Sequence, residues 1–264
     1  MRRYTDPRHR EVRNVPQPGE PQPGIAKSSP EALLRAYWAE IAARRTPWPS
    51  EPELATQLGI SRPALREALV RLEVEGLIRR RRGDATYVNA PASRIVTRFD
   101  QQARFDMALS DAGLDASTEH ILAETVIVTD DQAATLEVAN GSPALRVVKR
   151  WRANGVIVMV AKDLIPLVRS DGRALELPEP LVTPVRLFPF IHALRNEPIE
   201  WEIARPSAAT PTSEERAWFD DDELDAMLTL DLTGVSRQGN VLYQNRELHR
   251  PGAVPFGFVR SIRH

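Results

Sequence analysis

The sequence of 264 residues contains no cysteine. This absence excludes disulfide bonds, zinc sites built from thiolates and a cysteine nucleophile. The sequence has five histidines, but it has none of the motifs HExxH, GxSxG or the P-loop, and no paired spacing of histidine and carboxylate. We therefore predict that the protein is not an enzyme and that it binds no metal and no cofactor.

Long apolar runs are missing as well. No run approaches the roughly 18 residues that a membrane-spanning helix needs. The first 28 residues are polar and rich in proline, without the apolar core of a signal peptide. We expect a cytoplasmic protein that does not contact a membrane. The composition of residues 1–28 is typical of a disordered arm.

The net charge of −1 hides an asymmetry between two parts of the chain. Residues 1–90 contain 16 Lys and Arg against 11 Asp and Glu, whereas residues 91–264 contain 19 against 25. The first part is therefore basic and the second acidic. Such a split is expected when one domain faces a polyanion and the other does not. The length favours about two domains.

Residues 50–88 have the layout of two short helices followed by a basic hairpin. Ser50 can cap the first helix, Glu53 can complete a capping box, and Gly59 can supply the left-handed residue that ends it. The first helix is therefore predicted over Glu51–Leu58.

The second helix is predicted over Arg62–Glu75. Ser61 is its N-cap, Pro63 stands in the first turn where its missing N–H costs nothing, and Gly76 follows its end. An earlier helix is predicted over residues 30–45. Apolar side chains at three- and four-residue spacing give the motif one buried face, which consists of Leu54, Leu58, Leu65, Leu69 and Leu72.

In a helix-turn-helix, the second helix lies in the major groove of DNA and its N-terminal residues meet the base edges. Arg62 and Arg66 occupy this position. The run Arg79–Arg82 precedes Gly83 on the hairpin, which would follow the phosphates or the minor groove. The alternative, that these arginines form only a solvated surface, does not account for the agreement of caps, glycines and leucine spacing.

The segments SEPELA, SRPALREAL, EGLI and GDATYV resemble the DNA-binding domain of the GntR superfamily of bacterial transcription regulators. The resemblance implies a winged helix-turn-helix over residues 29–89, in which Gly83 and Thr86 hold the wing tip against a phosphate. Pro52 and Ala85 depart from the family, which usually has a basic residue and a second wing glycine at these positions. The predicted DNA-binding residues are Ser50, Ser61, Arg62, Arg66, Arg71, Arg81, Arg82, Gly83 and Thr86.

A short linker of small residues and proline is predicted at residues 90–94, followed by a domain of mixed α and β structure at residues 95–264. Its clearest element is a hairpin with strands Ala144–Arg152 and Val156–Ile165 around the favoured turn Asn154–Gly155. The other predicted elements are a strand Ile121–Val128, a helix from Thr129 through Val138 that ends at Asn140–Gly141, a helix Val185–Arg195, a strand Pro198–Arg205, a helical stretch Thr212–Met227, a weaker second hairpin Leu230–Ser236 and Val241–His249, and a last strand Val254–Ile262.

Two βαβ-like halves with long hairpins, placed after such a DNA-binding domain, resemble the UTRA ligand-binding domain of the HutC subfamily, whose fold is that of chorismate lyase. The fragments PALRVVKRWRANG and LYQNRELHRPGAVPFGFVR carry this resemblance. It implies an α+β protein whose residues 95–264 form a UTRA-type α/β domain that binds a small metabolite, often a phosphorylated sugar or a carboxylate.

The resemblance places the two arginines that commonly hold the anion at Arg150 and Arg152. Both lie on one face of their strand because side chains alternate. Two guanidiniums on one face repel unless something negative lies between them, and their forked donors suit a carboxylate or phosphate. The open alternative is a half-exposed polar strand face that is paired with nearby carboxylates.

Other positions of the family pattern differ in this chain. Ala161 stands where sugar-phosphate binders have Glu on the return strand, and Pro189 stands where they have Ser before the middle helix. Tyr243 and His249 stand at the usual Glu and Tyr positions of the second hairpin. We therefore predict a flatter, more apolar ligand with an acidic end, in a cleft lined by Tyr243 and His249 together with the two arginines.

These features predict a transcription regulator that represses its genes, binds a pseudo-palindromic operator in double-stranded DNA as a homodimer and is released by a small anionic metabolite. One alternative is a DNA-binding regulator whose second domain only dimerises or binds a protein partner. Another is a chorismate lyase-like enzyme, which likeness of fold alone does not support.

Overall fold

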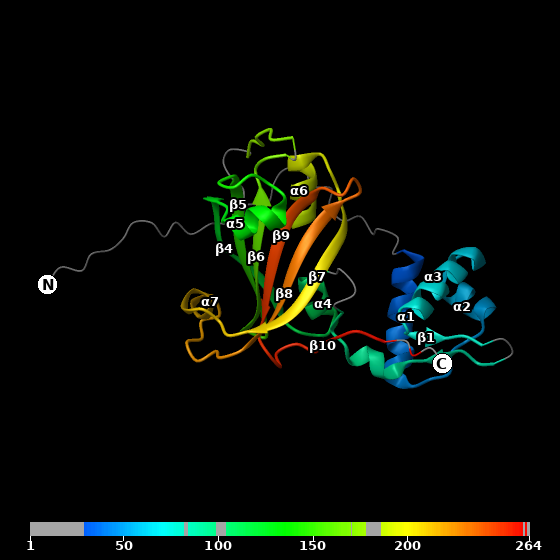
Figure 1. Ribbon diagram of the computed structural model, residues 1–264. Coiled ribbons are helices and arrows are strands. Elements are labelled where there is room, and N and C mark those ends of the chain that lie inside the picture. The colour runs from blue at the N-terminus through cyan, green and yellow to red at the C-terminus, as the bar shows by residue number, and fades with distance from the viewer. Residues whose placement is uncertain are drawn as a thin grey trace, which may run out of the picture. The chain divides into compact units, whose positions relative to one another are not determined.

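The computed structural model describes residues 29–81, 84–98, 104–169, 171–177, 186–260 and 262. The chain divides into two compact units, with the boundary between Pro91 and Ala92 (Figure 1). The predicted arm of residues 1–28 lies outside the described residues. The predicted linker forms a short 3-10 helix, Ala90–Arg94, which contains the boundary. In the part of the chain that is described, no helix is both long enough and apolar enough to cross a membrane.

The described part of the first unit contains three helices and a small hairpin, which Figure 1 shows packed together. Its elements are α1 (Pro30–Arg44), α2 (Glu51–Leu58), α3 (Arg62–Val74), β1 (Ile78–Arg79) and β2 (Tyr87–Val88). The predicted helices agree with these bounds to within one residue. Leu58 of the predicted apolar face is only partly buried. Five leucines that are at most 1% exposed form the core, namely Leu34, Leu54, Leu65, Leu69 and Leu72.

Short-range hydrogen bonds set the helix ends. The Ser61 hydroxyl accepts from the backbone N–H of Ala64 at 3.4 Å, and the backbone N–H of Ser50 donates to the Glu53 carboxylate at 3.0 Å. Gly59 ends α2 with a φ of 64°, the left-handed conformation that glycine adopts without strain. The turn between α2 and α3 therefore follows from local sequence alone.

Two side-chain hydrogen bonds fix the hairpin to the helices. The Trp38 indole N–H of α1 donates to the Leu77 carbonyl at 2.9 Å, and the Asn89 amide donates to the Gly76 carbonyl at 2.8 Å. Because both carbonyls belong to the segment that joins α3 to β1, the position of the hairpin relative to α3 is defined.

The second unit is built on a six-stranded sheet with strand order β4-β5-β6-β9-β8-β7, in which all neighbours are antiparallel. A separate parallel pair joins β3 (Thr97–Arg98) to β10 (Phe256–Gly257). The strands of the sheet are β4 (Ala116–Ile127), β5 (Pro143–Ala153), β6 (Val156–Pro166), β7 (Ile199–Ala209), β8 (Met227–Ser236) and β9 (Val241–His249), and the helices are α4 (Phe105–Asp111), α5 (Asp130–Leu136), α6 (Leu187–Arg195) and α7 (Ser213–Trp218).

The second unit contains an internal repeat. The order α4-β4-α5-β5-β6 recurs as α6-β7-α7-β8-β9, and the two copies meet where β6 pairs with β9. The predicted second hairpin is thus confirmed. The expected βαβ-like character is wrong, because α5 and α7 each connect antiparallel neighbours, whereas a βαβ unit joins parallel strands.

Each face of the sheet is covered by two helices. On one face, hereafter the α5/α7 face, Val148 and Leu248 pack against Trp218 of α7, and Ala144 packs against Leu136 of α5. On the opposite face, hereafter the α4/α6 face, clusters form around Leu109 of α4 and around helix α6. Alternate residues of each strand therefore belong to different cores.

The turn Asn154–Gly155 has φ values of 50° and 82°, as the favoured two-residue hairpin turn requires. Several predicted ends are wrong. Strand β4 begins at Ala116 and not at Ile121, and β7 continues to Ala209 and not only to Arg205, because pairing with β5 and β8 extends over these residues. Helix α5 ends at Leu136, because Glu137 already adopts a left-handed φ of 55° before Asn140–Gly141 is reached. Helix α7 stops at Trp218 because the Phe219 ring, 2% exposed, turns into the core, and the following segment leads into β8. The last strand is limited to Phe256–Gly257.

Two further differences concern helices of the second unit. Helix α4 was not predicted; its Leu109 is fully buried in the core that it forms with β5 and β6. Pro189 lies inside α6, and Arg186 is the residue before this helix. The predicted assignment of Pro189 to the position preceding the middle helix is therefore wrong.

Candidate DNA interface and effector site

Helix α3 presents its arginines on two flanks. Leu65 and Leu69 face the core, and Arg62 and Arg66 are exposed. Arg66 and Arg71 are five residues apart, which at about 100° per residue puts them about 140° apart around the helix axis. Arg62 and Arg66 thus occupy one flank of the exposed surface, and Arg71 occupies the other.

Arg66 points toward α2. Its Nε donates to Oε2 of Glu51 at 3.1 Å, and its side chain is 69% exposed. The contact with Glu51 uses only the N–H on Nε, so the N–H groups on the two terminal nitrogens are left for other partners. The arrangement leaves Arg66 able to donate to an acceptor outside the protein.

Arg71 lies beside α1 instead. Its Nη1 donates to Glu31 at 2.6 Å and its Nη2 donates to Glu67 at 2.9 Å. The hydrogen bond to Glu31, followed by the one to Glu67, raises the pKa of Arg71. Two carboxylates neutralise this arginine, so its predicted DNA contact would have to compete with them.

The basic run on the hairpin alternates in direction. Arg79 and Arg81 are exposed, whereas Arg80 turns toward the helices. The backbone N–H of Arg80 donates to Glu73 at 2.9 Å and its Nε donates to the same carboxylate at 3.1 Å. Burial would raise the pKa of Glu73, but these bonds from Arg80 lower it. The expectation that the whole run faces DNA is therefore corrected for Arg80.

The other predicted DNA-binding residues have mixed outcomes. Arg82 and Gly83 lie outside the described residues, and Thr86 is half-buried on the hairpin. The Ser50 hydroxyl donates to Glu53 at 2.8 Å, and the Ser61 hydroxyl accepts from a backbone N–H. Both serines act as helix caps, and their contact with DNA stays a prediction.

In the second unit, Arg150 and Arg152 share one carboxylate. Arg150 Nη1 lies 3.2 Å from Oδ1 of Asp220, and Arg152 Nη2 lies 3.0 Å from Oδ2. Glu119 on β4 accepts from Arg150 Nε at 2.7 Å, and the Trp218 carbonyl accepts from its Nη1 at 3.1 Å. The two arginines lie on the same strand face, as predicted, and carboxylates of the chain itself pair with both.

These contacts also set the proton equilibria of the cluster. The hydrogen bond from Arg152 lowers the pKa of Asp220 below its usual value, and Arg150 adds to the effect. The hydrogen bond to Glu119 raises the pKa of Arg150. Both shifts favour the charged forms of Asp220 and Arg150, and the Asp220 carboxylate is held between two guanidiniums.

Tyr243 and His249 do not line the same cleft as the arginines. Strand register pairs Lys149 with Ala161, and Ala161 in turn with Glu247. Directly paired residues share a face, so odd-numbered residues of β5 lie on the same face as odd-numbered residues of β9 in this region. Tyr243 and His249 are therefore on the α4/α6 face, whereas the arginines are on the α5/α7 face, and the predicted common cleft is wrong.

The two residues also occupy different cores. Tyr243 is 1% exposed, packs near Phe188 of α6 and donates its hydroxyl to Glu202 of β7. Burial, with the nearby Glu202 carboxylate, raises the pKa of Tyr243. His249 is also 1% exposed; its ring contacts Phe105 of α4, and its Nε2 lies 3.0 Å from Glu247.

Between these two cores lies a polar row that the sequence prediction missed. Lys149 Nζ lies 2.9 Å from Oδ2 of Asp163, and Asn245 Nδ2 donates to Oδ1 of Asp163 at 2.6 Å. Among the described residues, Asn245 Oδ1 and His249 Nδ1 have no hydrogen-bond partner. Charged residues at inward positions of apolar strands, as in VIVMVAKDLIP, were the available signal.

Two family models match the chain. The model described as "Bacterial regulatory proteins, gntR family" matches residues 41–88, and the model of the UTRA domain matches residues 111–254, more than half of the chain. The chain belongs to the GntR family. Within this family of transcription regulators it falls in the branch that carries a UTRA domain, the HutC subfamily. The predicted family and fold class are confirmed, and the matched family is one of transcription regulators.

Similar proteins come from several bacteria. The HTH-type transcriptional regulator Mce2R of Mycobacterium tuberculosis is 42% identical over 71 residues, which are 25% of this chain and 30% of that protein. The HTH-type transcriptional repressor NagR of Bacillus subtilis is 29% identical over 120 residues, 46% of this chain and 49% of that protein. The chain thus spans between 30% and 49% of the length of these curated relatives.

Solved structures extend the likeness to both units. PhnF from Mycobacterium smegmatis is 22% identical, with a TM-score of 0.54 over 87% of this chain and 100% of that chain. The possible transcriptional regulator YydK from Bacillus subtilis is 14% identical, with a TM-score of 0.60 over 89% of this chain and 99% of that chain. At these identities the likeness concerns the fold alone.

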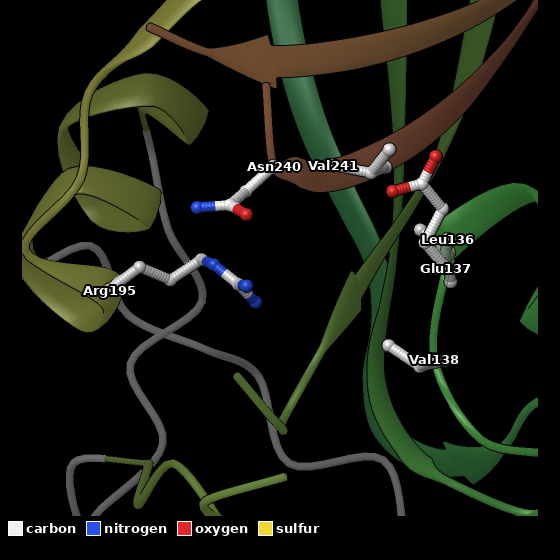
Figure 2. Close-up of a pocket in the computed structure, with 6 residues that line it drawn as sticks. All are labelled: Leu136, Glu137, Val138, Arg195, Asn240 and Val241. Atoms are coloured by element: carbon white, nitrogen blue, oxygen red, sulfur yellow. The ribbon is translucent and has the colours of Figure 1, made fainter. Parts of the chain in front are cut away.

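The UTRA domain also has a small pocket at the end of its sheet. Figure 2 shows Arg195 and Asn240 on one side of this pocket and Leu136, Glu137 and Val138 on the other. Arg195 is 3% exposed and donates to the Pro166 carbonyl at 3.0 Å; burial lowers its pKa. The pocket contains neither Arg150 nor Arg152 in its lining, so it is separate from the predicted anion clamp.

Proposed function

We propose that this regulator represses transcription by binding a pseudo-palindromic operator as a homodimer, and that a small anionic metabolite releases it. For the DNA step, the support is the exposed flank of α3 that carries Arg62 and Arg66, together with the outward direction of Arg79 and Arg81. Arginine donors at the start of a recognition helix suit base edges, and arginines on a wing suit phosphates.

A homodimer is expected because one recognition helix covers too few base pairs for useful specificity. Twofold symmetry would place two such helices on half-sites about one helical turn apart. We propose that the UTRA domain carries the dimer contact through edge strand β7, where Trp201 is 67% exposed and Ile203 is 49% exposed. Both lie on the same face of the strand, and exposed apolar edges favour association with another chain.

The single observation that carries the effector proposal is the position of Asp220 between Arg150 and Arg152. The arginine pair already binds one carboxylate, so a diffusible carboxylate or phosphate offers the same chemistry. The Asp220 side chain is 56% exposed, and ion pairs of this kind contribute about 0–1 kcal/mol. A ligand with two anionic oxygens and further apolar contacts can therefore replace Asp220.

Release from DNA requires that the effector binds better to the arrangement that spaces the two DNA-binding units wrongly. The segment after α7 is the element that the effector would move. Asp220 has a left-handed φ of 50°, and its neighbour Asp221 accepts from Arg250 Nη1 at 2.6 Å. Displacement of Asp220 would therefore act on the connection between α7, β8 and the end of β9.

A second candidate function is a regulator whose UTRA domain only dimerises or binds a protein partner. The pairing of Arg150 and Arg152 with Glu119 and Asp220 favours it, because both arginines have carboxylate partners without any ligand. The two candidates differ in one measurable property, which is the response of DNA binding to small anions.

The test uses the full chain and an operator selected from random duplex DNA. Inorganic phosphate, an aromatic carboxylate such as benzoate, and glucosamine 6-phosphate are added separately, and melting temperature and operator affinity are measured. An acidic ligand should raise the melting temperature and lower the operator affinity. The combined substitution Arg150→Ala and Arg152→Ala should abolish both responses while DNA binding persists, and Asp220→Asn should strengthen them.

Arg146→Ala is the matched control for this test. Arg146 lies on the same face of β5 and donates to Glu124 of β4 at 2.8 Å, but it does not contact Asp220. It should leave both responses intact. A response that survives the double substitution would move the effector site elsewhere, with the polar row around Asn245 as the first place to examine. No response to any anion would favour the second candidate.

A further inference from the structure

We propose that Glu51 is a positioning residue for base recognition, which orients Arg66 of α3 and links this helix to the wing through Arg80. Glu51 is the first residue of α2 and has no predicted contact with DNA of its own. The inference rests on the proposed role of Arg66 as a base-reading residue, and it adds the group that presents Arg66 to the base.

The geometry joins three elements at one carboxylate. Oε2 of Glu51 accepts from Arg66 Nε at 3.1 Å, and Oε1 of Glu51 lies 3.7 Å from Arg80 Nη1. Glu73 of α3 holds Arg80 from the other side, with Nη2 and Oε2 3.0 Å apart. Arg80 is therefore anchored to the helices, and Glu51 is the carboxylate that contacts both the helix arginine and the wing arginine.

The contact with Glu51 determines which N–H donors of Arg66 are left to bind a base. An arginine side chain has five N–H donors in a planar fork, and Glu51 uses the one on Nε. This contact leaves unused the two N–H groups at the far end of the guanidinium, one on each terminal nitrogen. A pair of terminal N–H donors matches O6 and N7 of guanine, which is the commonest specific contact of arginine in the major groove. Glu51 thus fixes the guanidinium in a direction suited to bidentate binding.

The exposure of the pair is consistent with this role. The Arg66 side chain is 69% exposed and that of Glu51 is 40% exposed. A flexible arginine loses rotamer freedom when it binds a base, and a fixed partner removes part of this loss beforehand.

The Glu51 carboxylate should favour recognition of one base pair but weaken binding to DNA of any sequence. A negative charge near the DNA backbone repels phosphates whatever the sequence. Removal of the Glu51 charge should therefore strengthen binding to random DNA and at the same time weaken discrimination at the base pair that Arg66 reads. A purely electrostatic role would produce only the first change. A purely structural role at the start of α2 would lower melting temperature and all DNA binding together.

Glu67 provides a matched control. It lies on α3 with 70% exposure of its side chain and pairs with Arg71 at 2.9 Å, but it does not contact Arg66. Glu67→Gln removes an equal charge from α3, the helix that carries Arg66. It should strengthen binding to random DNA without a loss of discrimination at the base pair read by Arg66.

The experiment uses the full-length protein. An operator is selected from a randomised duplex library. The affinities for all its single-base-pair variants and for random DNA are then measured. The proteins compared are wild type, Glu51→Gln, Glu67→Gln, Arg66→Ala and the double variant Glu51→Gln with Arg66→Ala. At the base pair where Arg66→Ala reduces discrimination between operator variants, Glu51→Gln should reduce this discrimination about fivefold or more. The combined variant should be no less specific than Arg66→Ala alone.

Glu51→Asp guards against a loss of folding. Aspartate keeps the negative charge favoured at the start of a helix but is too short to reach Arg66 in the same way. It should lose discrimination without gaining affinity for random DNA, at an unchanged melting temperature. If Arg66→Ala alters base preference and neither Glu51 variant does, the positioning role is wrong while the reading role stands. If Arg66→Ala leaves base preference unchanged, both roles are wrong.

Discussion

Lys149 and Asp163 form a buried ion pair on the α4/α6 face of the UTRA domain. Their Nζ and Oδ2 atoms are 2.9 Å apart, and the side chains are 6% and 0% exposed. Asn245 donates a second hydrogen bond to the same carboxylate at 2.6 Å. Because burial of a charge is costly unless the charge is paired, each partner depends on the other.

Lys149→Met should therefore lower the free energy of unfolding by about 3–5 kcal/mol, because it leaves Asp163 charged and unpaired. Urea unfolding of the full chain measures this loss. Arg246→Met is the control, since Arg246 and Asp231 are 38% and 37% exposed and such pairs contribute about 0–1 kcal/mol. Lys149→Met combined with Asp163→Leu should recover most of the stability. Equal small losses for both single variants would contradict the buried pair.

Arg66 and Arg81 should affect DNA binding in different ways. Arg66→Ala should weaken operator binding by about 1–3 kcal/mol and relax base preference. Arg81→Ala should weaken all DNA alike and reduce the salt dependence of binding by about one phosphate contact. Titrations at several salt concentrations separate the two. Unchanged preference in the Arg66 variant would contradict the assigned role of α3.

Substitutions on the two edge strands should test the dimer contact. Trp201→Glu places a charge on the exposed surface of β7 and should convert a dimer into a monomer at micromolar concentration in sedimentation experiments. Ile127→Glu is the control, because Ile127 is 64% exposed on the opposite edge strand β4. A wild-type chain that sediments as a monomer would argue against the homodimer. A dimer that resists Trp201→Glu but not Ile127→Glu would place the contact on β4.

Glu215 should make stability depend on acid pH. It is 5% exposed and accepts from Lys162 Nζ at 2.7 Å and from the Thr212 backbone N–H at 2.9 Å. Burial opposes the charged form, but these bonds lower the pKa of Glu215. A lowered pKa contributes stability that is fully present above the unfolded value of about 4.3 and is lost as pH falls through the folded value.

The free-energy difference between wild type and Glu215→Gln should consequently be largest at neutral pH and should shrink below about pH 4. Urea unfolding at a series of pH values measures it. Lys162→Met should shrink the difference at neutral pH, because it removes one of the bonds that lower the pKa. If the free-energy difference did not depend on pH, Lys162 and Thr212 would not stabilise the charged form of Glu215.

Local sequence was sufficient for the helices of the DNA-binding unit and for the first hairpin of the UTRA domain. Ser50 with Glu53, Ser61 and Gly59 set helix ends through contacts within a few residues. Asn154–Gly155 favours one turn type for the same reason. The family resemblance also depended on such short segments, which is why it could be recognised without any knowledge of long-range contacts.

Tertiary structure decided which side chains share a site. Arg150 and Arg152 were placed on one face correctly, because alternation within a strand is a local rule. The relation of Arg150 to Tyr243 depends on the pairing of β5 with β6 and of β6 with β9, and a shift of one residue in either register reverses the face. Strands so far apart in sequence carry no local signal of their register.

The partners of the arginines were likewise a matter of tertiary structure. Asp220 follows helix α7, whose predicted length was wrong, and it reaches Arg150 and Arg152 across 70 and 68 residues of sequence. Glu51 meets Arg66 only because the turn between α2 and α3 brings the start of one helix beside the first turns of the next. The sequence by itself determined the family, the helix-turn-helix and the presence of a second, mixed α and β unit. Packing of distant segments decided which charges are paired, because a charge in a partly buried position is stable only where the fold supplies its counter-charge.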